Sequence, residues 1–225
     1  HLKRYIPINF LHKIRRVLFG NKKTFIVQED ATVFYPEVYQ LNPLFSYMFR
    51  GAWVNERYFQ DYKEALIKIF SFPPINEKTN QRYADEIMKT ESVSLHIRRG
   101  DYLNSPLYTL DVKYVKSAIQ CLEKKIDNPK YFIFTDDTTY VSRNYSFLQN
   151  AIVVTGNQGK RSFRDMQLMS LCKHNIIANS TFSFWGAYLN QNPNKIVIAP
   201  AKAADKLKNP FACSDWIKIG AENES

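Results

Sequence analysis

The chain has 225 residues, of which 45% are hydrophobic and 15% aromatic, so it can bury a sizeable core in one large or two small domains. This composition excludes a disordered chain. No apolar run approaches the ~18 residues that a membrane-spanning helix needs. Three cysteines without CxxC spacing disfavour a disulfide framework and a cysteine zinc site, and they favour a reducing compartment. Lys and Arg outnumber Asp and Glu by 31 to 21, which gives a net charge of +10.

Residues 1–25 hold seven of the basic side chains and no acidic one. A basic surface of this kind suits a phosphate-bearing partner such as a nucleotide, nucleic acid or anionic lipid, or it only keeps the protein soluble. Helical spacing of apolar residues predicts an amphipathic helix over 57–70. The Pro-Pro step that follows breaks this helix, so a domain boundary is predicted within 71–79. We therefore expect an N-terminal region at 1–79 and a C-terminal domain at 80–225.

A regular alternation of strands and helices begins at residue 92. Five short, almost continuously apolar runs predict strands at 92–97, 131–135, 151–155, 175–178 and 196–199. Strands of this kind are covered on both faces, so the sequence predicts a doubly wound α/β domain with a parallel sheet over about residues 88–222. In that fold ligands bind beyond the carboxyl ends of the strands, where three loops of this chain carry reactive or polar side chains.

The first of these loops contains two adjacent arginines, Arg98 and Arg99. Neighbouring residues on an extended chain point to opposite sides, so one arginine can face a ligand while the other faces the scaffold. A diphosphate clamp is one interpretation, and a surface arginine paired with Asp101 is the other. Gly100 permits a tight turn or a close approach to a ligand. His96 is either a satisfied core histidine or a ring that hydrogen-bonds a base.

Two consecutive carboxylates, Asp136 and Asp137, make up the second loop. Their spacing does not suit the D-x-D metal site of sugar-nucleotide enzymes, and no nearby histidine adds a ligand. A carboxylate at a strand end can instead accept hydrogen bonds from a purine edge or a ribose, or it can cap the next helix. We expect one aspartate of the pair to cap and the other to face the ligand.

The third loop, Asn179 to Gly186, joins a strand to a helix N-terminus. Unsatisfied backbone N–H groups and the helix dipole make such a terminus a phosphate site, and three hydroxyls add donors. Ordinary N-capping is the simpler interpretation, and both can hold together. The chain contains no GxGxxG, Walker A, GxSxG or HExxH motif, which lowers the rank of hydride transfer, P-loop hydrolysis and zinc hydrolysis.

Taken together, these segments resemble glycosyltransferase family 11, the bacterial-type α-1,2-fucosyltransferases. The resemblance is carried by His96–Tyr102, Phe134–Asp137, Asp165–Ala187, Gly51–Phe59, Lys195–Pro200 and Trp216–Ile219. It covers about residues 50–220, and the long run that begins at Asp165 is very specific. The glycine-rich segment with which the family usually opens has no counterpart in this sequence.

The resemblance implies an α/β, GT-B-like fold. A C-terminal doubly wound parallel-sheet domain at 80–225 would bind the GDP-sugar, and a partial N-terminal α/β domain at 1–79 would lie on the acceptor side. The implied reaction is an inverting transfer of L-fucose from GDP-fucose to the 2-hydroxyl of a galactose-containing acceptor glycan, which makes an α-1,2 linkage. The resemblance also implies that this transfer needs no metal and no cofactor.

The same resemblance implies a role for the residues of each loop. Arg98 would offset the charge of the leaving diphosphate, with Arg99 as a second clamp or as an orienter of the loop. Asp101 is the nearest carboxylate that could act as the base, although it could equally pair with an arginine. His96 and Asp136 would hold the guanine. The donor-binding residues of the third loop would be Asn179, Ser180, Thr181, Phe182 and Ser183.

Three other functions rank below this one. A sugar-nucleotide transferase could use a different donor, and a homologue of this family could bind the nucleotide without transferring the sugar. A nucleic-acid or membrane-surface module built on residues 1–25 ranks below both. We expect no nucleic-acid partner, and we expect a cytoplasmic protein with the option of peripheral association with the anionic inner face of a bacterial membrane.

Overall fold

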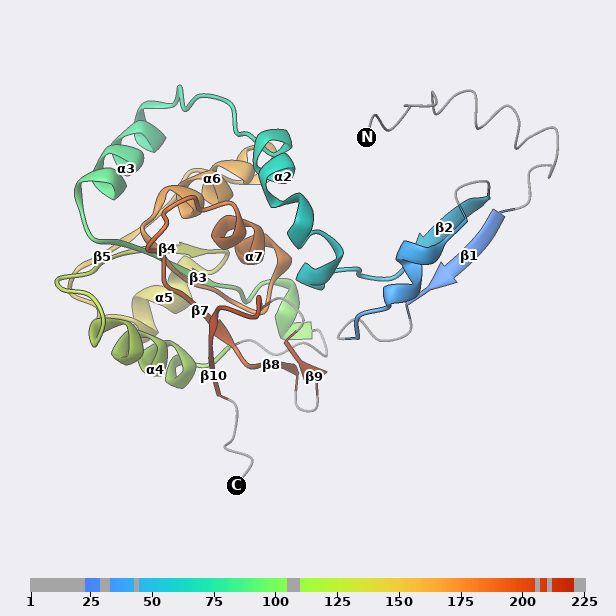
Figure 1. Ribbon diagram of the computed structural model, residues 1–225. Coiled ribbons are helices and arrows are strands. Elements are labelled where there is room, and N and C mark those ends of the chain that lie inside the picture. Colours follow the sequence, from blue (N-terminus) through green and yellow to red (C-terminus); the bar gives the residue numbers. More distant parts are fainter. Residues whose placement is uncertain are drawn as a thin grey trace. The chain divides into compact units, whose positions relative to one another are not determined.

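The structure is a computed structural model, and it describes residues 23–28, 33–42, 45–104, 110–204, 207–209 and 212–220. The chain divides into two compact units, residues 1–58 and residues 59–225 (Figure 1). None of the helices in the described ranges combines the length and the apolarity required to cross a bilayer.

The first unit is built around a parallel pair of strands. Its elements are β1 (Lys23–Val27), η1 (Pro36–Gln40), β2 (Ser46–Arg50) and η2 (Glu56–Tyr58). Gln28, buried at the end of β1, accepts a hydrogen bond on its Oε1 from the backbone N–H of Trp53 at 2.8 Å. Gly51 lies against this side chain with φ +149°, and a Cβ there would lie 2.5 Å from Gln28 Cβ. Only glycine therefore lets the chain turn so closely past β1.

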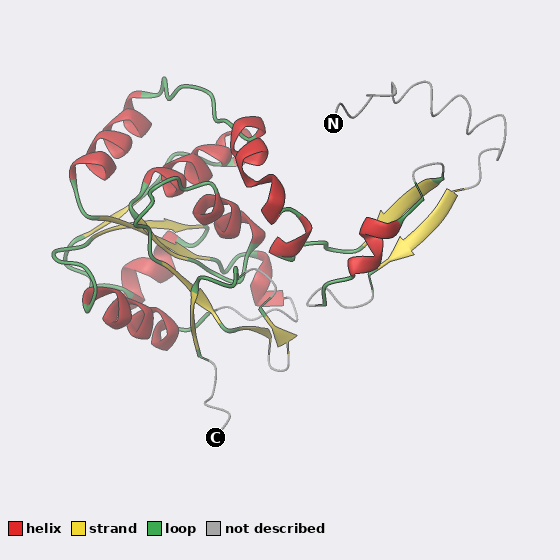
Figure 2. Cartoon of the chain, viewed as in Figure 1, coloured by secondary structure: helices red, strands yellow, loops and turns green. Residues whose placement is uncertain are grey.

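The second unit holds most of the regular structure (Figure 2). Its elements are η3 (Gln60–Tyr62), α2 (Lys63–Ile69), α3 (Lys78–Lys89), β3 (Ser92–Ile97), η4 (Asp101–Asn104), α4 (Val112–Glu123), β4 (Lys130–Thr135), α5 (Thr138–Asn144), β5 (Ala151–Val153), η5 (Gly159–Arg161), α6 (Phe163–Leu171), β6 (His174–Ile176), α7 (Thr181–Tyr188), β7 (Val197–Pro200), β8 (Lys202–Ala204), β9 (Leu207–Lys208) and β10 (Ile217–Ile219). The helix predicted over 57–70 is wrong in its first half, where 3₁₀ turns precede α2.

Six parallel strands form the main sheet, in the order β10-β7-β6-β3-β4-β5. The chain starts in the middle at β3 and steps outward through β4 and β5. It then returns to β6 and steps outward in the other direction through β7 and β10. The order therefore reverses between β3 and β6. In open α/β sheets this switch point marks the crevice where ligands bind, beyond the carboxyl ends of the strands.

Apolar side chains cover both faces of this sheet. In β4, Tyr131 and Ile133 belong to the core under α4 and α5, whereas Phe132 and Phe134 belong to the core under α3 and α6. Successive residues of a strand point to opposite faces, so an all-apolar strand needs helices on both sides. The predicted fold class is confirmed: the domain is α/β, with a doubly wound parallel sheet that is consistent with a GT-B-like fold.

The compact units divide at residue 58, and the domain boundary expected within 71–79 stays a prediction. Arg164 in α6 explains why the segment with the prolines stays with the second unit. This guanidinium is only 5% exposed, donates to the carbonyl oxygens of Pro73 at 2.7 Å and Pro74 at 2.8 Å, and pairs with Glu77 at 3.2 Å. Two prolines do end a helix, but their carbonyls remain acceptors, and one buried arginine binds both.

Candidate functional site

Two of the loops predicted to carry function meet at the switch point between β3 and β6. Tyr102, in η4 after β3, donates its hydroxyl to the backbone oxygen of Asn179, after β6, at 3.0 Å. The ring of the same tyrosine lies 5.8 Å from Arg98 Cζ. One side chain thus links the first loop to the third. The side chain of Asp101 lies outside the part that the structure describes, so its role as the base stays a prediction.

Strand pairing places the two arginines opposite the two aspartates. β3 and β4 are parallel and pair residue by residue to their carboxyl ends, so the residues that follow them also face each other. Arg98 Nη1 lies 2.7 Å from Asp136 Oδ2, and Arg99 Nε lies 3.3 Å from Asp137 Oδ2. Both ion pairs therefore join the first loop to the second.

Asp136 contacts the first loop at more than one point. Its Oδ1 accepts a hydrogen bond from the backbone N–H of Arg99 at 2.9 Å, in addition to the ion pair that Oδ2 makes with Arg98. A Cβ added at Gly100 would lie 2.8 Å from Asp136 Oδ2, so the carboxylate keeps this position only because residue 100 has no side chain. The carboxylate expected to hold the guanine is thus engaged by the loop after β3, and its contact with a base stays a prediction.

Asp137 is the capping member of the aspartate pair. Its Oδ1 accepts a hydrogen bond from the backbone N–H of Tyr140 at 2.8 Å, at the start of α5. The ring of Tyr140 in turn lies 3.5 Å from Arg99 Cζ. The expectation that one aspartate caps a helix is confirmed. Arg99 is held between a carboxylate and an aromatic face with a side chain 18% exposed, whereas the side chain of Arg98 is 34% exposed.

His96 lies at the carboxyl end of β3 and is only 7% exposed. Its Nδ1 has no hydrogen-bond partner within the described residues. Burial, and to a smaller extent the charge of Arg98, lowers the pKa of His96 to about 4, so the ring is neutral at physiological pH. A neutral imidazole with a buried, unpartnered nitrogen can bind a polar group of a ligand by a directed hydrogen bond.

The third loop caps α7 as the sequence predicts. The backbone N–H of Phe182 donates to Ser180 Oγ at 3.3 Å, so Ser180 is the N-cap. Asn179 and Ser180 are buried, and Thr181 is exposed at the first position of the helix. The positive end of the α7 dipole thus lies beside Tyr102 and the first loop, where it favours an anion.

Ser183 has a structural role in this loop. Its hydroxyl accepts a hydrogen bond from the backbone N–H of Ala178 at 3.2 Å and lies 3.3 Å from the backbone oxygens of Ala178 and Ser180. The side chain is 1% exposed. Its predicted contact with the donor therefore remains untested, while its bonds within the loop hold the N-terminus of α7 in place.

A further polar cluster, at the carboxyl end of β5, was not predicted. Asp165, in the first turn of α6, accepts a hydrogen bond from Asn157 Nδ2 at 2.8 Å, and Asn157 exchanges two bonds of 2.8 Å with Asn80 in α3. Burial outweighs the bond from Asn157 and raises the pKa of Asp165 to about 6. In the sequence, Asp165 is marked only as the first residue of the run Asp165–Ala187 that resembles the family. No spacing pattern in the sequence marks the loop residues Tyr102 and Tyr140.

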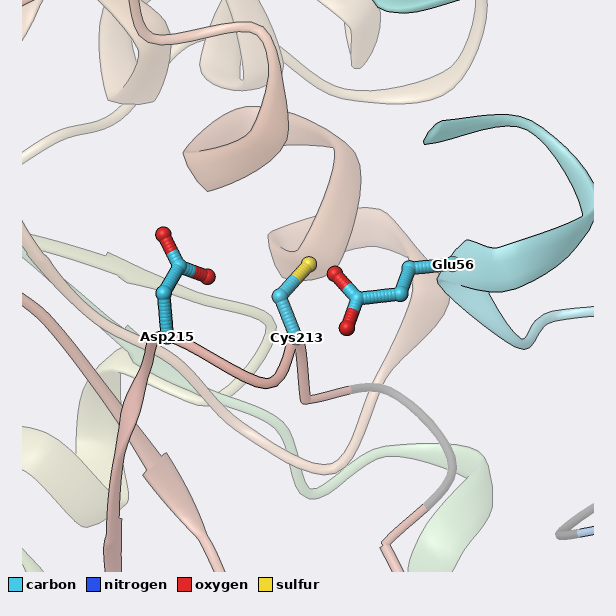
Figure 3. A group of neighbouring side chains, drawn as sticks. All are labelled: Glu56, Cys213 and Asp215. Carbon is cyan, nitrogen blue, oxygen red and sulfur yellow. The ribbon is translucent and has the colours of Figure 1, made fainter. Parts of the chain in front are cut away.

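Figure 3 shows three side chains of types that ligate metal ions: Glu56, Cys213 and Asp215. Cys213 is buried among the apolar residues that pack under α7, and Asp215 is exposed just before β10. Glu56 begins η2 and belongs to the first unit, whereas the other two belong to the second. We therefore assign no metal site to this group.

Comparison with known proteins agrees with the motifs. The sequence model of glycosyl transferase family 11 matches residues 35–220. An alpha-1,2-colitosyltransferase of Escherichia coli is 35% identical over 185 residues, which are 76% of this chain and 62% of that protein. The O-antigen biosynthesis glycosyltransferase WbnK of Escherichia coli is 38% identical over 134 residues, 57% of this chain and 44% of its own. The galactoside 2-alpha-L-fucosyltransferase SEC1 of Bos taurus is 31% identical over 105 residues, 43% of this chain and 28% of its own.

The chain spans less than two thirds of the length of each of these three relatives. The family match nevertheless covers most of the chain and includes all three loops at the carboxyl ends of the strands. The resemblance found in the sequence is thereby confirmed, and the chain belongs to glycosyl transferase family 11.

Proposed function

We propose that this chain acts as an inverting α-1,2-fucosyltransferase that moves L-fucose from GDP-fucose to the 2-hydroxyl of a galactose-containing acceptor glycan. Membership of the family and the names of its relatives support this class of reaction. The observation that carries the proposal is the position of Arg98, a permanent cation with a third of its side chain exposed at the switch point of the sheet.

Arg98 is the cation that we assign to stabilising the negative charge that develops in this reaction. When the sugar leaves GDP, negative charge develops on the diphosphate, and a preorganised cation stabilises that charge. The N-terminus of α7 adds a partial positive charge beside the same loop. We propose that these two features suffice and that transfer proceeds without a divalent metal ion or other cofactor.

Different residues are candidates for holding the guanine and for deprotonating the acceptor hydroxyl. His96, neutral and buried, has a nitrogen available for a hydrogen bond to the guanine. Asp101, in η4, is the candidate for the group that takes the proton of the acceptor hydroxyl. We propose a cytoplasmic location, which suits a nucleotide-sugar donor, with peripheral association with the anionic inner face of a bacterial membrane.

Colitose is the second candidate for the transferred sugar. An alpha-1,2-colitosyltransferase is 35% identical to this chain over 76% of its length. Colitose differs from fucose by the absence of one hydroxyl, so a single hydrogen bond in the donor pocket would separate the two donors. Parallel assays with GDP-fucose and GDP-colitose decide between them by the ratio of kcat/KM.

Thermal stabilisation by nucleotides in EDTA tests the proposal. GDP is expected to raise the Tm more than UDP or ADP at equal concentration, because a ligand that binds the folded state stabilises it. The same protein is then incubated with GDP-fucose and a β-galactoside, and the linkage of the product is determined. Selective GDP binding with α-1,2-linked fucose as product supports the proposal. Equal effects of all three nucleotides, or transfer that appears only after Mg²⁺ or Mn²⁺ is added, contradict it.

A further inference from the structure

We propose that Asp136 is a positioning residue: it holds Arg98 and the loop after β3 in place for the diphosphate, and it does not contact the nucleoside base. This inference rests on the proposed function, because it concerns how the same donor would be bound. It differs from the role that the family resemblance first suggested for this carboxylate.

Three separate contacts fix the first loop to Asp136. Oδ2 pairs with Arg98 Nη1 at 2.7 Å, Oδ1 accepts the backbone N–H of Arg99 at 2.9 Å, and the carboxylate lies against Gly100, where a Cβ would lie 2.8 Å from Oδ2. One carboxylate thus bonds to a side chain and to the backbone of consecutive residues. Such an arrangement orients a loop, since moving the carboxylate would move both partners.

The geometry of arginine makes this contact effective. A guanidinium is a rigid plane with five N–H donors, so a contact at Nη1 together with an aromatic ring beside Cζ restricts the orientation of the whole group. The ring of Tyr102 lies 5.8 Å from Arg98 Cζ, and its hydroxyl is fixed to the backbone oxygen of Asn179. Arg98 is therefore oriented between Asp136 and Tyr102 while its side chain remains 34% exposed to a ligand.

A direct bond from Asp136 to a base is the competing interpretation. The two carboxylate oxygens already accept from Arg98 and from the N–H of Arg99, and the side chain is only 24% exposed. A carboxylate oxygen can accept a second hydrogen bond, so a base would have to share these oxygens with Arg98 and with the N–H of Arg99. The competing interpretation therefore predicts that loss of Asp136 weakens guanosine binding as well as GDP binding, whereas the positioning role predicts a loss for the diphosphate alone.

The test compares a ligand that carries the diphosphate with one that lacks it. Binding of GDP and of guanosine to the full chain is measured by ligand-observed NMR for the wild type, Asp136→Ala, Gly100→Ala and Arg98→Ala, and for the double variant Asp136→Ala/Arg98→Ala. Gly100→Ala forces the carboxylate aside without changing any charge, and it keeps the test open if Asp136→Ala does not fold. Asp127→Ala, an exposed aspartate before β4 at the other end of that strand, is the matched control.

Both Asp136→Ala and Gly100→Ala are expected to weaken GDP binding by about tenfold, the size of one lost bond to a charged group, and to leave guanosine binding unchanged. The double variant is expected to bind GDP no more weakly than Arg98→Ala alone, since Asp136 acts through Arg98.

An equal loss of guanosine binding would overturn the inference in favour of a base contact. A gain in GDP affinity would overturn it by showing that the carboxylate only repels the anion. Absence of GDP binding by the wild type would instead overturn the proposed function, and the inference with it.

Discussion

Two histidines on neighbouring strands, His174 at the start of β6 and His96 near the end of β3, are both buried. His174 uses both ring nitrogens: Nδ1 accepts the backbone N–H of Ile196 at 3.0 Å, and Nε2 lies 2.8 Å from Glu91 Oε1. His96 Nδ1 has no such partner among the described residues. A buried polar atom without a hydrogen-bond partner raises the free energy of the folded state. A ligand that bonds to such an atom removes this cost, whereas an atom that already has a partner offers no such gain.

Charged side chains and a hollow surface do not by themselves identify the site, because the amino end of the sheet has both. At the amino end, a hollow of about 790 Å³ is lined in part by Glu91, Lys173 and Asn190. Lys173 Nζ pairs with Glu91 at 2.7 Å, and Asn190 Nδ2 donates to Cys172 O at 2.7 Å and to Asn175 Oδ1 at 2.8 Å. These polar groups bind one another and hold the fold together. The carboxyl end differs in the reversal of strand order and in a buried histidine nitrogen, His96 Nδ1, that has no hydrogen-bond partner among the described residues, and these two features mark it as the site.

The largest expected effect is on catalysis and comes from Arg98→Ala at the carboxyl end. Loss of the cation that stabilises the leaving diphosphate is expected to lower kcat by about 10²–10³. The Tm is expected to change little, because a third of the Arg98 side chain is exposed. Lys173→Ala removes a cation of similar exposure from the amino end and serves as the control. A similar loss of kcat in both variants would contradict the assignment of the site.

A pH effect on stability is expected from His96. Its folded-state pKa of about 4 lies below its ordinary value of 6.5, so the unfolded chain takes up the proton first as the pH falls. Stability is therefore lost between pH 6.5 and pH 4, by about 3 kcal/mol at pH 4. Urea unfolding of the wild type and of His96→Asn at pH 7 and pH 4 measures this difference. The same pH dependence in both proteins would show that His96 is not the group responsible.

Asp165 is expected to change the pH dependence of stability in the opposite sense to His96 and by a smaller amount, and Asp165→Asn tests this. Burial raises the folded-state pKa of Asp165 to about 6, above the ordinary 3.8, so the folded chain holds the proton more tightly. The wild type therefore loses stability as the pH rises through this window, by at most about 3 kcal/mol at pH 7 and by less once solvent screening of this partly exposed carboxyl is counted. The asparagine carries no charge to desolvate, so the variant should be the more stable protein at pH 7. Denaturant unfolding of both proteins at pH 4 and pH 7 measures the gain in the free energy of unfolding. If the variant's stability relative to the wild type is lower at pH 7 than at pH 4, the prediction is contradicted.

Short-range patterns in the sequence predicted much of this fold. The strand at 92–97 has the predicted bounds, and the helix cap at Ser180 follows from the residue types of its loop. The sixth strand, β10, was not predicted, because three residues at the edge of a sheet carry too little periodicity. A Pro-Pro step indicates a break in a helix but not which unit the segment packs on, so it could not reveal the division at residue 58.

The partners within the site depend on contacts that no local pattern reveals. The sequence could show that one aspartate caps a helix, since capping is local, and Asp137 does so. It could not show that Asp136 meets Arg98, because that contact follows from the register between β3 and β4. That His96 Nδ1 lacks a hydrogen-bond partner among the described residues likewise follows from what packs around β3, and no local pattern in the sequence reveals it.

The smallest expected effect comes from Glu91→Gln at the amino end. The hydrogen bond from Lys173, and then that from His174, lowers the pKa of Glu91 below its ordinary 4.5, so its contribution to stability is present above that pH and is lost on further acidification. Glutamine keeps an acceptor for His174 but loses the charge that pairs with Lys173. Because this pair is partly exposed, we expect a loss of about 1 kcal/mol or less at pH 7, measured by urea unfolding. GDP affinity and kcat should stay at wild-type values. A drop in either would place the amino end in the functional site, and satisfied hydrogen bonding would then no longer distinguish one end of the sheet from the other.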